Sequence, residues 1–193
     1  MNGYSRHGIA QLESDGMVDT SFNPGIRFKD EFPTIQTVFS TILQQDGKIL
    51  VGGNFTSSEG NQTNMIARLN PDSSFDPTFN TGTGFNNIVK AIAVQPDGKI
   101  LVGGHFTSYN GIETRHLLRL NPDGTFDQSF LTGECFNKEV EDLCIQPDGK
   151  ILVVGAFTTY NSLPANRIIR LNPDGSLDLA FNSGEACDDR IND

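Results

Sequence analysis

An internal repeat of 51 residues constrains this chain more than any other feature of its sequence. The string Arg-Leu-Asn-Pro-Asp begins at Arg68, Arg119 and Arg170. Two further strings, Gln-x-Asp-Gly-Lys-Ile-Leu-Val and Gly-x-Phe-Thr, recur at the same interval, and a weaker copy precedes them at residues 11–16. Three anchors in one register predict an array of equivalent structural units, because self-similarity at such a period is typical of repeat folds.

The middle repeat is expected to form four short strands, at residues 89–95, 99–106, 116–120 and 125–127. The tripeptides Pro96-Asp97-Gly98 and Pro122-Asp123-Gly124 predict tight turns within the first and last pairs, since Pro sets φ and Gly accepts a positive φ. A third turn is expected at residues 109–111. No stretch of the sequence has a helical period.

The second strand of the repeat is apolar on both faces. Ile100 and Val102 alternate with Leu101 and Gly103, whereas a sheet with one wet face would alternate polar and apolar residues. Small antiparallel sheets covered on both faces, at a period near 50 residues, are typical of β-propeller blades. The sequence therefore predicts an all-β fold of four-stranded antiparallel propeller blades.

The chain contains about three and a half such repeats in one repeat domain. We expect a half blade at 3–25, whole blades at 35–82, 86–133 and 137–184, and a tail at 185–193. Closed propellers have about four to eight blades, so this number does not close a ring alone. A longer parent chain, self-association, or an open array capped by another protein would each explain the number, and the first two are favoured over a free monomer.

Acidic residues outnumber basic ones by 24 to 14, which gives a formal net charge of -10. Nucleic-acid backbones and anionic membrane surfaces need a basic face, so neither is expected as the main partner. The sequence has no apolar run long enough to span a bilayer, and no membrane insertion is expected.

The three cysteines, Cys135, Cys144 and Cys187, lack metal-ligand spacing. A Cys135–Cys144 disulfide stays open as an alternative. The favoured interpretation makes Cys144 a small apolar core residue and the other two incidental.

The repeated block Ala-Ile-Ala-Val-Gln-Pro-Asp-Gly-Lys-Ile-Leu-Val-Gly-Gly-x-Phe-Thr, followed by Arg-Leu-Asn-Pro-Asp-Gly-Ser-Phe-Asp, resembles the delta-sixty (delta-60) repeat family. The resemblance extends from about Ile9 to Gly184 and implies propeller repeats of bacterial, often exported, proteins and of some phage proteins. It implies no general activity, catalytic motif or cofactor. Val154, where the other copies have Gly, and Ser73, where two copies have Gly, depart from the pattern and are interpreted as tolerated drift.

Charged residues that recur in every blade are expected to be structural. The recurring Asp, Arg, Lys and Phe series are Asp19, Asp76, Asp127 and Asp178; Arg68, Arg119 and Arg170; Lys48, Lys99 and Lys150; and Phe22, Phe79, Phe130 and Phe181. Each Asp is expected to accept backbone or Arg hydrogen bonds, and each Phe to pack between blades, since repetition in every blade is typical of a scaffold. Rings of ion-binding charge are the less favoured alternative.

Strand alternation places the loops on two rims. The Pro-Asp-Gly turns would share one rim, here called the turn rim. The loops between second and third strands, with the linkers between blades, would share the other, here called the loop rim. The loop-rim sequences differ between copies, as in residues 61–64, 112–115 and 163–166. Binding residues tend to lie on variable loops of a rigid scaffold, so the loop rim is the predicted recognition face.

The candidate binding residues on this rim are Asn54, His105, Tyr109, Asn110, Glu113, Arg115, His116, Tyr160, Asn161 and Asn166. His105 and His116 would face each other if a hairpin centres on Asn110-Gly111, and Glu113 would lie nearby. A surface pair is favoured over a metal or acid–base site, because the pair occurs in one blade alone. No catalytic residue, metal or cofactor is predicted.

These patterns predict a non-enzymatic propeller module that binds a protein or a cell-surface polymer. Three alternatives stay open: a structural component of a virion or surface assembly, a lectin with a shallow sugar site between blades, and a hydrolase or lyase on the propeller axis. The enzyme alternative requires axis-facing acids or His that differ between blades. The expected location is extracellular, at a bacterial cell surface, or in a virion.

Overall fold

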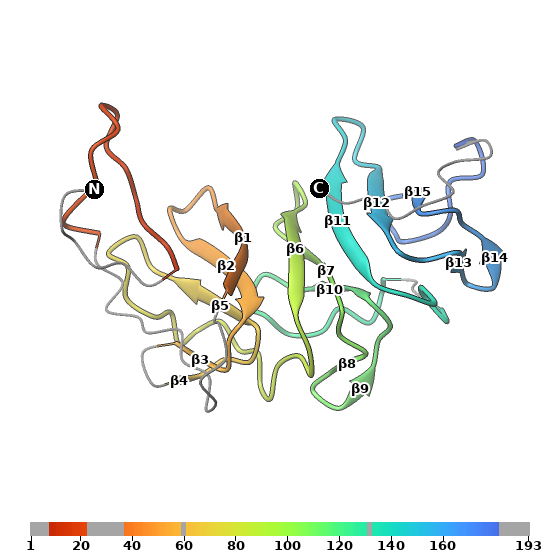
Figure 1. Ribbon diagram of the computed structural model, residues 1–193, viewed down its shortest axis with the longest axis horizontal. Coiled ribbons are helices and arrows are strands. Elements are labelled where there is room, and N and C mark those ends of the chain that lie inside the picture. Colours follow the sequence, from red (N-terminus) through yellow and green to blue (C-terminus); the bar gives the residue numbers. More distant parts are fainter. Residues whose placement is uncertain (1–7, 23–36, 59–60, 131–132, 182–193) are drawn as a thin grey trace.

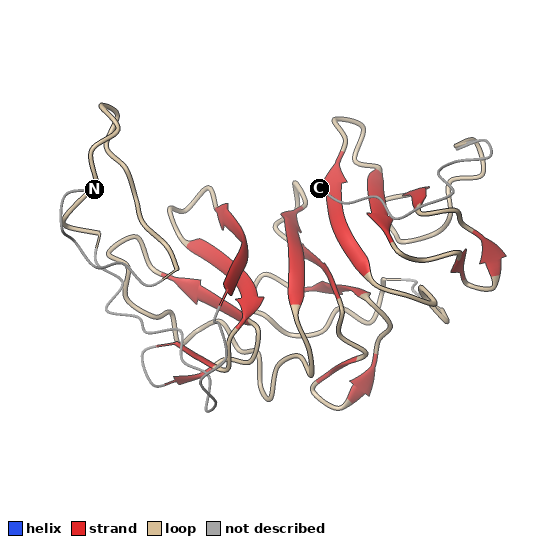
Figure 2. Ribbon diagram, in the orientation of Figure 1, coloured by secondary structure: helices blue, strands red, loops and turns tan. Residues whose placement is uncertain are grey.

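The computed structural model describes residues 8–22, 37–58, 61–130 and 133–181. These residues form strands and loops, and Figure 2 shows no helix among them. They contain three antiparallel three-stranded sheets, one in each of the last three repeats. The all-β propeller-blade class predicted from the sequence is confirmed.

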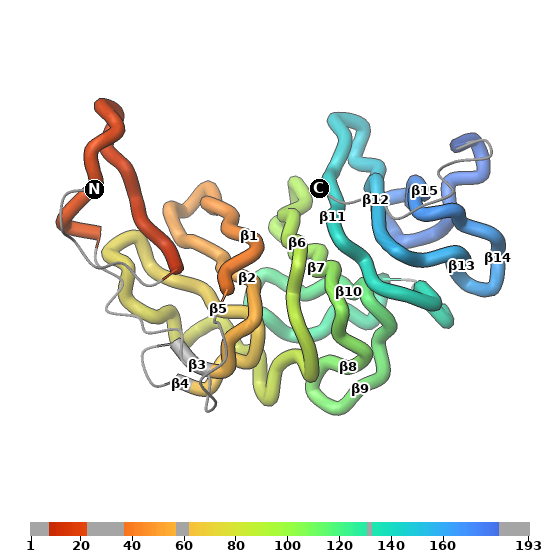
Figure 3. Tube along the Cα trace, viewed as in Figure 1, coloured from red at the N-terminus to blue at the C-terminus, as the bar shows by residue number. Residues whose placement is uncertain are grey.

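The three sheets have the same strand order along the chain. Blade 1 contains β1 (Thr37–Leu43), β2 (Ile49–Asn54) and β5 (Ile66–Leu69); blade 2 contains β6 (Val89–Val94), β7 (Ile100–Gly104) and β10 (Leu117–Leu120); blade 3 contains β11 (Val140–Ile145), β12 (Ile151–Gly155) and β15 (Ile168–Leu171). In each blade the second-strand position, apolar on both faces, is central. The blades lie side by side in an open row, with residues 8–22 at one end and blade 3 at the other (Figures 1 and 3).

The fourth strand of each blade is shorter than the sequence suggested. It is a single antiparallel bridge, from Leu69 to Phe75, from Leu120 to Phe126 and from Leu171 to Leu177. Leu12 pairs with Val18 in the same way, so residues 8–22 form a half-blade of third and fourth strands. The strand ends at once because the Asp that follows turns the chain: the Oδ1 atom of Asp127 accepts the N–H of Ser129 at 3.0 Å.

A small two-stranded hairpin, separate from the main sheet, joins the second and third strands around the turn expected at residues 109–111. The hairpins are β3 (Ser57–Ser58) with β4 (Asn61–Gln62), β8 (Ser108–Tyr109) with β9 (Ile112–Glu113), and β13 (Thr159–Tyr160) with β14 (Leu163–Pro164). The turn of the second hairpin is Asn110-Gly111, with φ of 50° and 74°. Positive φ at both central residues favours the tight hairpin turn, and Asn and Gly tolerate it best.

Blades pack through a glycine of the central strand. A Cβ atom on Gly52 would lie 2.6 Å from Cγ1 of Val89, and one on Gly103 would lie 2.6 Å from Cγ1 of Val140. Each glycine thus admits the first strand of the next blade. The buried clusters join neighbouring blades in the same way: Leu101 of blade 2 belongs to the cluster that contains Val153 of blade 3.

We predict that Gly103→Ala destabilises the chain by about 1–3 kcal/mol, because the new methyl group overlaps the buried Val140 side chain. Urea unfolding followed by circular dichroism measures the change. Val154→Ala, at the equivalent position of blade 3, is the matched control and should cost less. Equal stability of Gly103→Ala and the wild type would contradict this packing.

Candidate functional site

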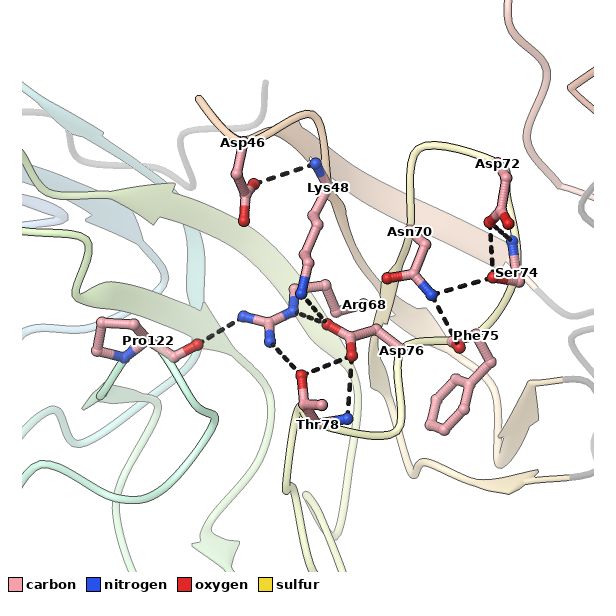
Figure 4. Close-up of polar contacts among 10 residues, drawn as sticks. All are labelled: Asp46, Lys48, Arg68, Asn70, Asp72, Ser74, Phe75, Asp76, Thr78 and Pro122. Atoms are coloured by element: carbon pink, nitrogen blue, oxygen red, sulfur yellow. Dashed lines mark hydrogen bonds and ion pairs between the residues drawn. The ribbon is translucent and has the colours of Figure 1, made fainter.

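An ion cluster occupies the same place in each blade, and Figure 4 shows the one in blade 1. Nε of Arg68 donates to Oδ2 of Asp76 at 2.6 Å, and Nζ of Lys48 donates to the same oxygen at 2.9 Å. The other carboxylate oxygen accepts the hydroxyl of Thr78 at 2.6 Å. The Lys–Asp and Arg–Asp distances are 2.8 and 2.7 Å in both blade 2 and blade 3.

The arginine of this cluster also bonds to the next blade. Nη1 of Arg68 donates to the carbonyl of Pro122 at 2.6 Å, and Nη1 of Arg119 donates to that of Pro173 at 2.8 Å. The guanidinium of Arg68 lies 4.7 Å from the ring centroid of Phe79. The prediction that the recurring Asp, Arg and Phe residues hold the scaffold is confirmed.

The cluster lowers the pKa of its carboxylates. Burial raises the pKa of Asp127, but hydrogen bonds from Lys99, Ser129 and Arg119 outweigh burial and hold that pKa well below its usual range. A carboxyl group whose pKa is lower in the folded than in the unfolded chain stabilises the fold above its unfolded pKa.

We predict that Asp127→Ala destabilises the chain by about 2–3 kcal/mol, because it leaves Arg119 and Lys99 without their shared buried acceptor. Chemical denaturation measures the loss. Asp97→Ala, which removes an exposed carboxylate from a turn of the same blade, should change stability by less than about 1 kcal/mol.

The loss caused by Asp127→Ala should depend on pH. Above about pH 5 the loss should be constant. Below about pH 4 it should shrink, because the unfolded wild-type chain then binds a proton at this aspartate while the ion-paired carboxylate of the folded chain stays charged. Denaturation of both proteins across this pH range tests the prediction. A loss that stays constant down to pH 2 would contradict it.

A constant hydrogen-bond frame supports the loop rim. Oδ1 of Asn86 accepts the N–H groups of Thr107 and Ser108 at 2.9 and 3.0 Å. Asn137 binds Thr158 and Thr159 at the same two distances. The linkers between blades therefore hold the hairpins in one geometry, although the exposed side chains differ.

Several predicted binding residues belong to this frame. Tyr109 and Tyr160 lie in the core at 0% and 1% exposure, and each hydroxyl donates to a backbone carbonyl at 2.6 Å. Burial raises the pKa of both phenols. Oδ1 of Asn110 accepts the N–H of Gly84 at 3.0 Å, and Asn161 accepts that of Cys135 at 2.8 Å. All four side chains therefore bond within the rim; the two tyrosines are buried, whereas Asn110 is exposed and Asn161 is half-buried.

The two histidines lie opposite each other, as the hairpin predicts, but their side chains have different partners. His116 is buried, its Nδ1 lies 3.2 Å from the carbonyl of Gly104, and burial lowers its pKa. Nε2 of His105 lies 3.3 Å from Oε1 of Glu141 in blade 3. Within the described part of the chain, no group of three His, Cys, Asp or Glu side chains could hold a metal ion.

The cysteine interpretation needs correction. Cys135 is buried and Cys144 is exposed, and both are free thiols. Cys144 lies on strand β11 between the buried Leu143 and the half-buried Ile145, and the exposed face of that strand carries it outward. The third cysteine, Cys187, lies outside the described residues.

A polar recess of about 300 Å³ opens on the loop rim between blades 2 and 3. It is lined by Glu113, Thr114, Arg115, Gly133 and Glu134. Nη2 of Arg115 lies 2.7 Å from Oε1 of Glu113, which raises the pKa of the guanidinium. Glu113 and Arg115 were predicted to bind ligand, and the structure places them together. Asn166 is exposed and Asn54 half-buried, but neither lines the recess.

A row of side chains at the bulge of each first strand also differs between blades. The pairing of first and second strands skips Phe39, Lys90 and Glu141, which lie 51 residues apart. Nζ of Lys90 lies 4.2 Å from the ring centroid of Phe39 and 3.5 Å from Oε2 of Glu141. This row was not predicted from the sequence. The sequence feature that could have revealed it is one repeat position, within the first strand, that carries an aromatic, a basic and an acidic residue in the three copies.

A larger recess, of about 730 Å³, lies at the turn rim between the three blades. Its polar lining includes Gln44, Asp46 and Gln95 from the repeated turns, and Arg68, which is already bonded to Asp76. We therefore place the candidate recognition surface on the loop rim, where the exposed side chains are particular to one blade. The described residues contain no helix that could cross a bilayer.

Comparisons with known proteins agree with the architecture. Residues 1–22, 44–79, 95–130 and 146–181 match a family described as a beta-propeller domain of unknown function, DUF5122. No curated protein shows significant similarity to the chain.

Among solved structures, the chain is similar to a protein described as a candidate gluconolactonase, at 15% identity and a TM-score of 0.42. That alignment covers 86% of this chain and 53% of the other, so the chain spans about half the length of that protein. Likeness at this TM-score carries no argument about activity. The family match covers more than half of the sequence in the register of its repeats, and the chain therefore belongs to the DUF5122 beta-propeller family.

Proposed function

We propose that this chain is a non-enzymatic interaction module that binds a protein or a cell-surface polymer through its loop rim. One observation carries the proposal: a constant backbone frame, held by Asn86 and Asn137, presents side chains that differ from blade to blade. A rigid scaffold with variable exposed loops is a common design of binding proteins. An extracellular, cell-surface or virion setting is part of this proposal.

The recess between blades 2 and 3 has the chemistry of a polar binding surface. Glu113 and Arg115 are largely exposed, with 70% and 53% of their side chains accessible. Their exposed ion pair contributes little to stability and can exchange for a partner's charges at low cost. The guanidinium offers a planar fork for carboxylates, and the Glu134 carboxylate accepts hydroxyl groups, as it does from Ser162 at 2.7 Å.

The row of Phe39, Lys90 and Glu141, with His105 beside it, favours binding over catalysis. Acids and His that differ between blades are present there, as the enzyme alternative would require. The Glu141 carboxylate, however, lies within ion-pair distance of both Lys90 and His105, and its side chain is 8% exposed. A general base must reach the proton that it removes, and this carboxylate is enclosed by its neighbours.

We predict that the double variant Glu113→Ala/Arg115→Ala loses binding by about tenfold or more, because the exposed polar pair of the recess is removed. Binding of the labelled chain to a glycan array and to bacterial cell-envelope proteins, with cross-linking, provides the measurement. Binding to glycans alone would favour the lectin alternative.

The matched control is Asp46→Ala/Asp97→Ala on the turn rim, where both carboxylates are exposed and accept only a lysine N–H within their own turns. It should bind as the wild type does. Loss of binding in this control, with binding retained by the loop-rim variant, would overturn the proposal. Thermal unfolding verifies that both variants remain folded.

A further inference from the structure

The outer face of blade 3 repeats a contact surface whose partner is missing from the described chain. Arg68 and Arg119 each donate Nη1 to a proline carbonyl of the following blade, and both side chains are 8% exposed. Arg170 keeps its bond to Asp178 at 2.7 Å, but its exposure rises to 22%. Among the described residues, its two terminal nitrogens make no hydrogen bond.

The half-blade at the other end presents the matching acceptor. Its turn at residues 13–16 has the backbone bonds of the turns that accept Arg68 and Arg119: Glu13 donates to Met17 at 2.8 Å, and Gly16 donates to Glu13 at 2.9 Å. The corresponding bonds around Pro122 are 2.8 and 2.9 Å long. Ser14 occupies the place of the prolines and is exposed, so its carbonyl is the equivalent of theirs.

Charge on the two surfaces is also complementary. The turn that receives Arg68 carries Asp123, whose pKa is lowered chiefly by hydrogen bonds from Thr125 and further by the charge of Arg68. The half-blade turn carries Asp15 at the equivalent position and adds Glu13, where the other turns have Asn. Both acidic side chains are exposed.

Val154 restricts which structural unit can pack against the outer face of blade 3. At its position, Gly52 and Gly103 admit the valine of the next blade's first strand, and even a Cβ atom there would lie 2.6 Å from it. The Val154 side chain occupies that space on blade 3. A following blade with a first strand placed as in blades 2 and 3 would therefore collide with it. The described half-blade, with third and fourth strands only, brings no such strand.

We propose that two copies of this chain associate head to tail, with the outer face of blade 3 of one copy stacked on the half-blade of the other. Nη1 of Arg170 donates to the carbonyl of Ser14 of the second copy, and Val154 occupies the space that a first strand takes at the other blade contacts. Made reciprocally, the contact closes a two-fold ring of six blades and two half-blades, within the range of closed propellers.

Native mass spectrometry and light scattering of the full chain, without ligand, test this proposal. The wild type should form a dimer of twice 21.1 kDa. Arg170→Ala removes the donor and Glu13→Lys adds a like charge opposite it, so each should weaken the dimer about tenfold or more. Glu13→Lys lies on an exposed turn and keeps the test valid if Arg170→Ala unfolds blade 3.

Mixing the two variants distinguishes head-to-tail contact from a self-complementary interface. A mixed pair keeps one intact contact, between the blade 3 of Glu13→Lys and the half-blade of Arg170→Ala, so it should dimerise more strongly than either variant alone. A wild type that is monomeric at every soluble concentration would overturn the proposal. So would a dimer that both variants leave intact, or a mixture no stronger than its components.

Discussion

The stacking of the blades depends on an arginine, one in blade 1 and one in blade 2, that is bonded in two directions. Its Nε is held by the buried aspartate of its own blade, and its Nη1 donates to a carbonyl of the next blade, as Arg119 does to Asp127 and Pro173. A buried charge is costly unless it is paired and hydrogen-bonded, so the sequence must supply the aspartate and the lysine each time. The acceptor in the next blade is a backbone carbonyl, which is present whatever side chains that blade carries. Repeats of different sequence can therefore stack in one geometry.

The turn rim and the loop rim differ because blade stacking restricts the residues at blade contacts but not the exposed side chains of the loops. Residues that contact the neighbouring blade cannot change singly, because a bulky replacement at Gly103 would meet the buried Val140. On the loop rim, Asn86 and Asn137 fix the backbone through main-chain bonds, so exposed neighbours such as Glu113 and Arg115 are free to vary. Exposed side chains on the loop rim can therefore change without disturbing the contacts between blades.

The sequence predicted the propeller-repeat fold and the structural role of the recurring charges well, because both follow from a repeat period and from residue types that recur with it. It predicted individual rim side chains less well. Tyr109 was assigned to a turn on the surface, but it lies in the core because the hairpin folds back and brings its hydroxyl to the carbonyl of Gly124. The row of Phe39, Lys90 and Glu141 was not predicted, because a bulge alters which face a strand residue occupies.

The sequence alone determined the fold class, the period and the family, since apolar alternation, Pro-Asp-Gly turns and recurring ion partners are local and repeated signals. Tertiary structure alone decided which polar residues meet across blades, as Lys90, His105 and Glu141 do. It also places Val154 at the register position where Gly52 and Gly103 admit the next blade, although its sequence pattern resembled drift. The physical reason is that contacts between blades depend on bulges, hairpin folding and the space beside a single Cβ atom, none of which has a period in the sequence.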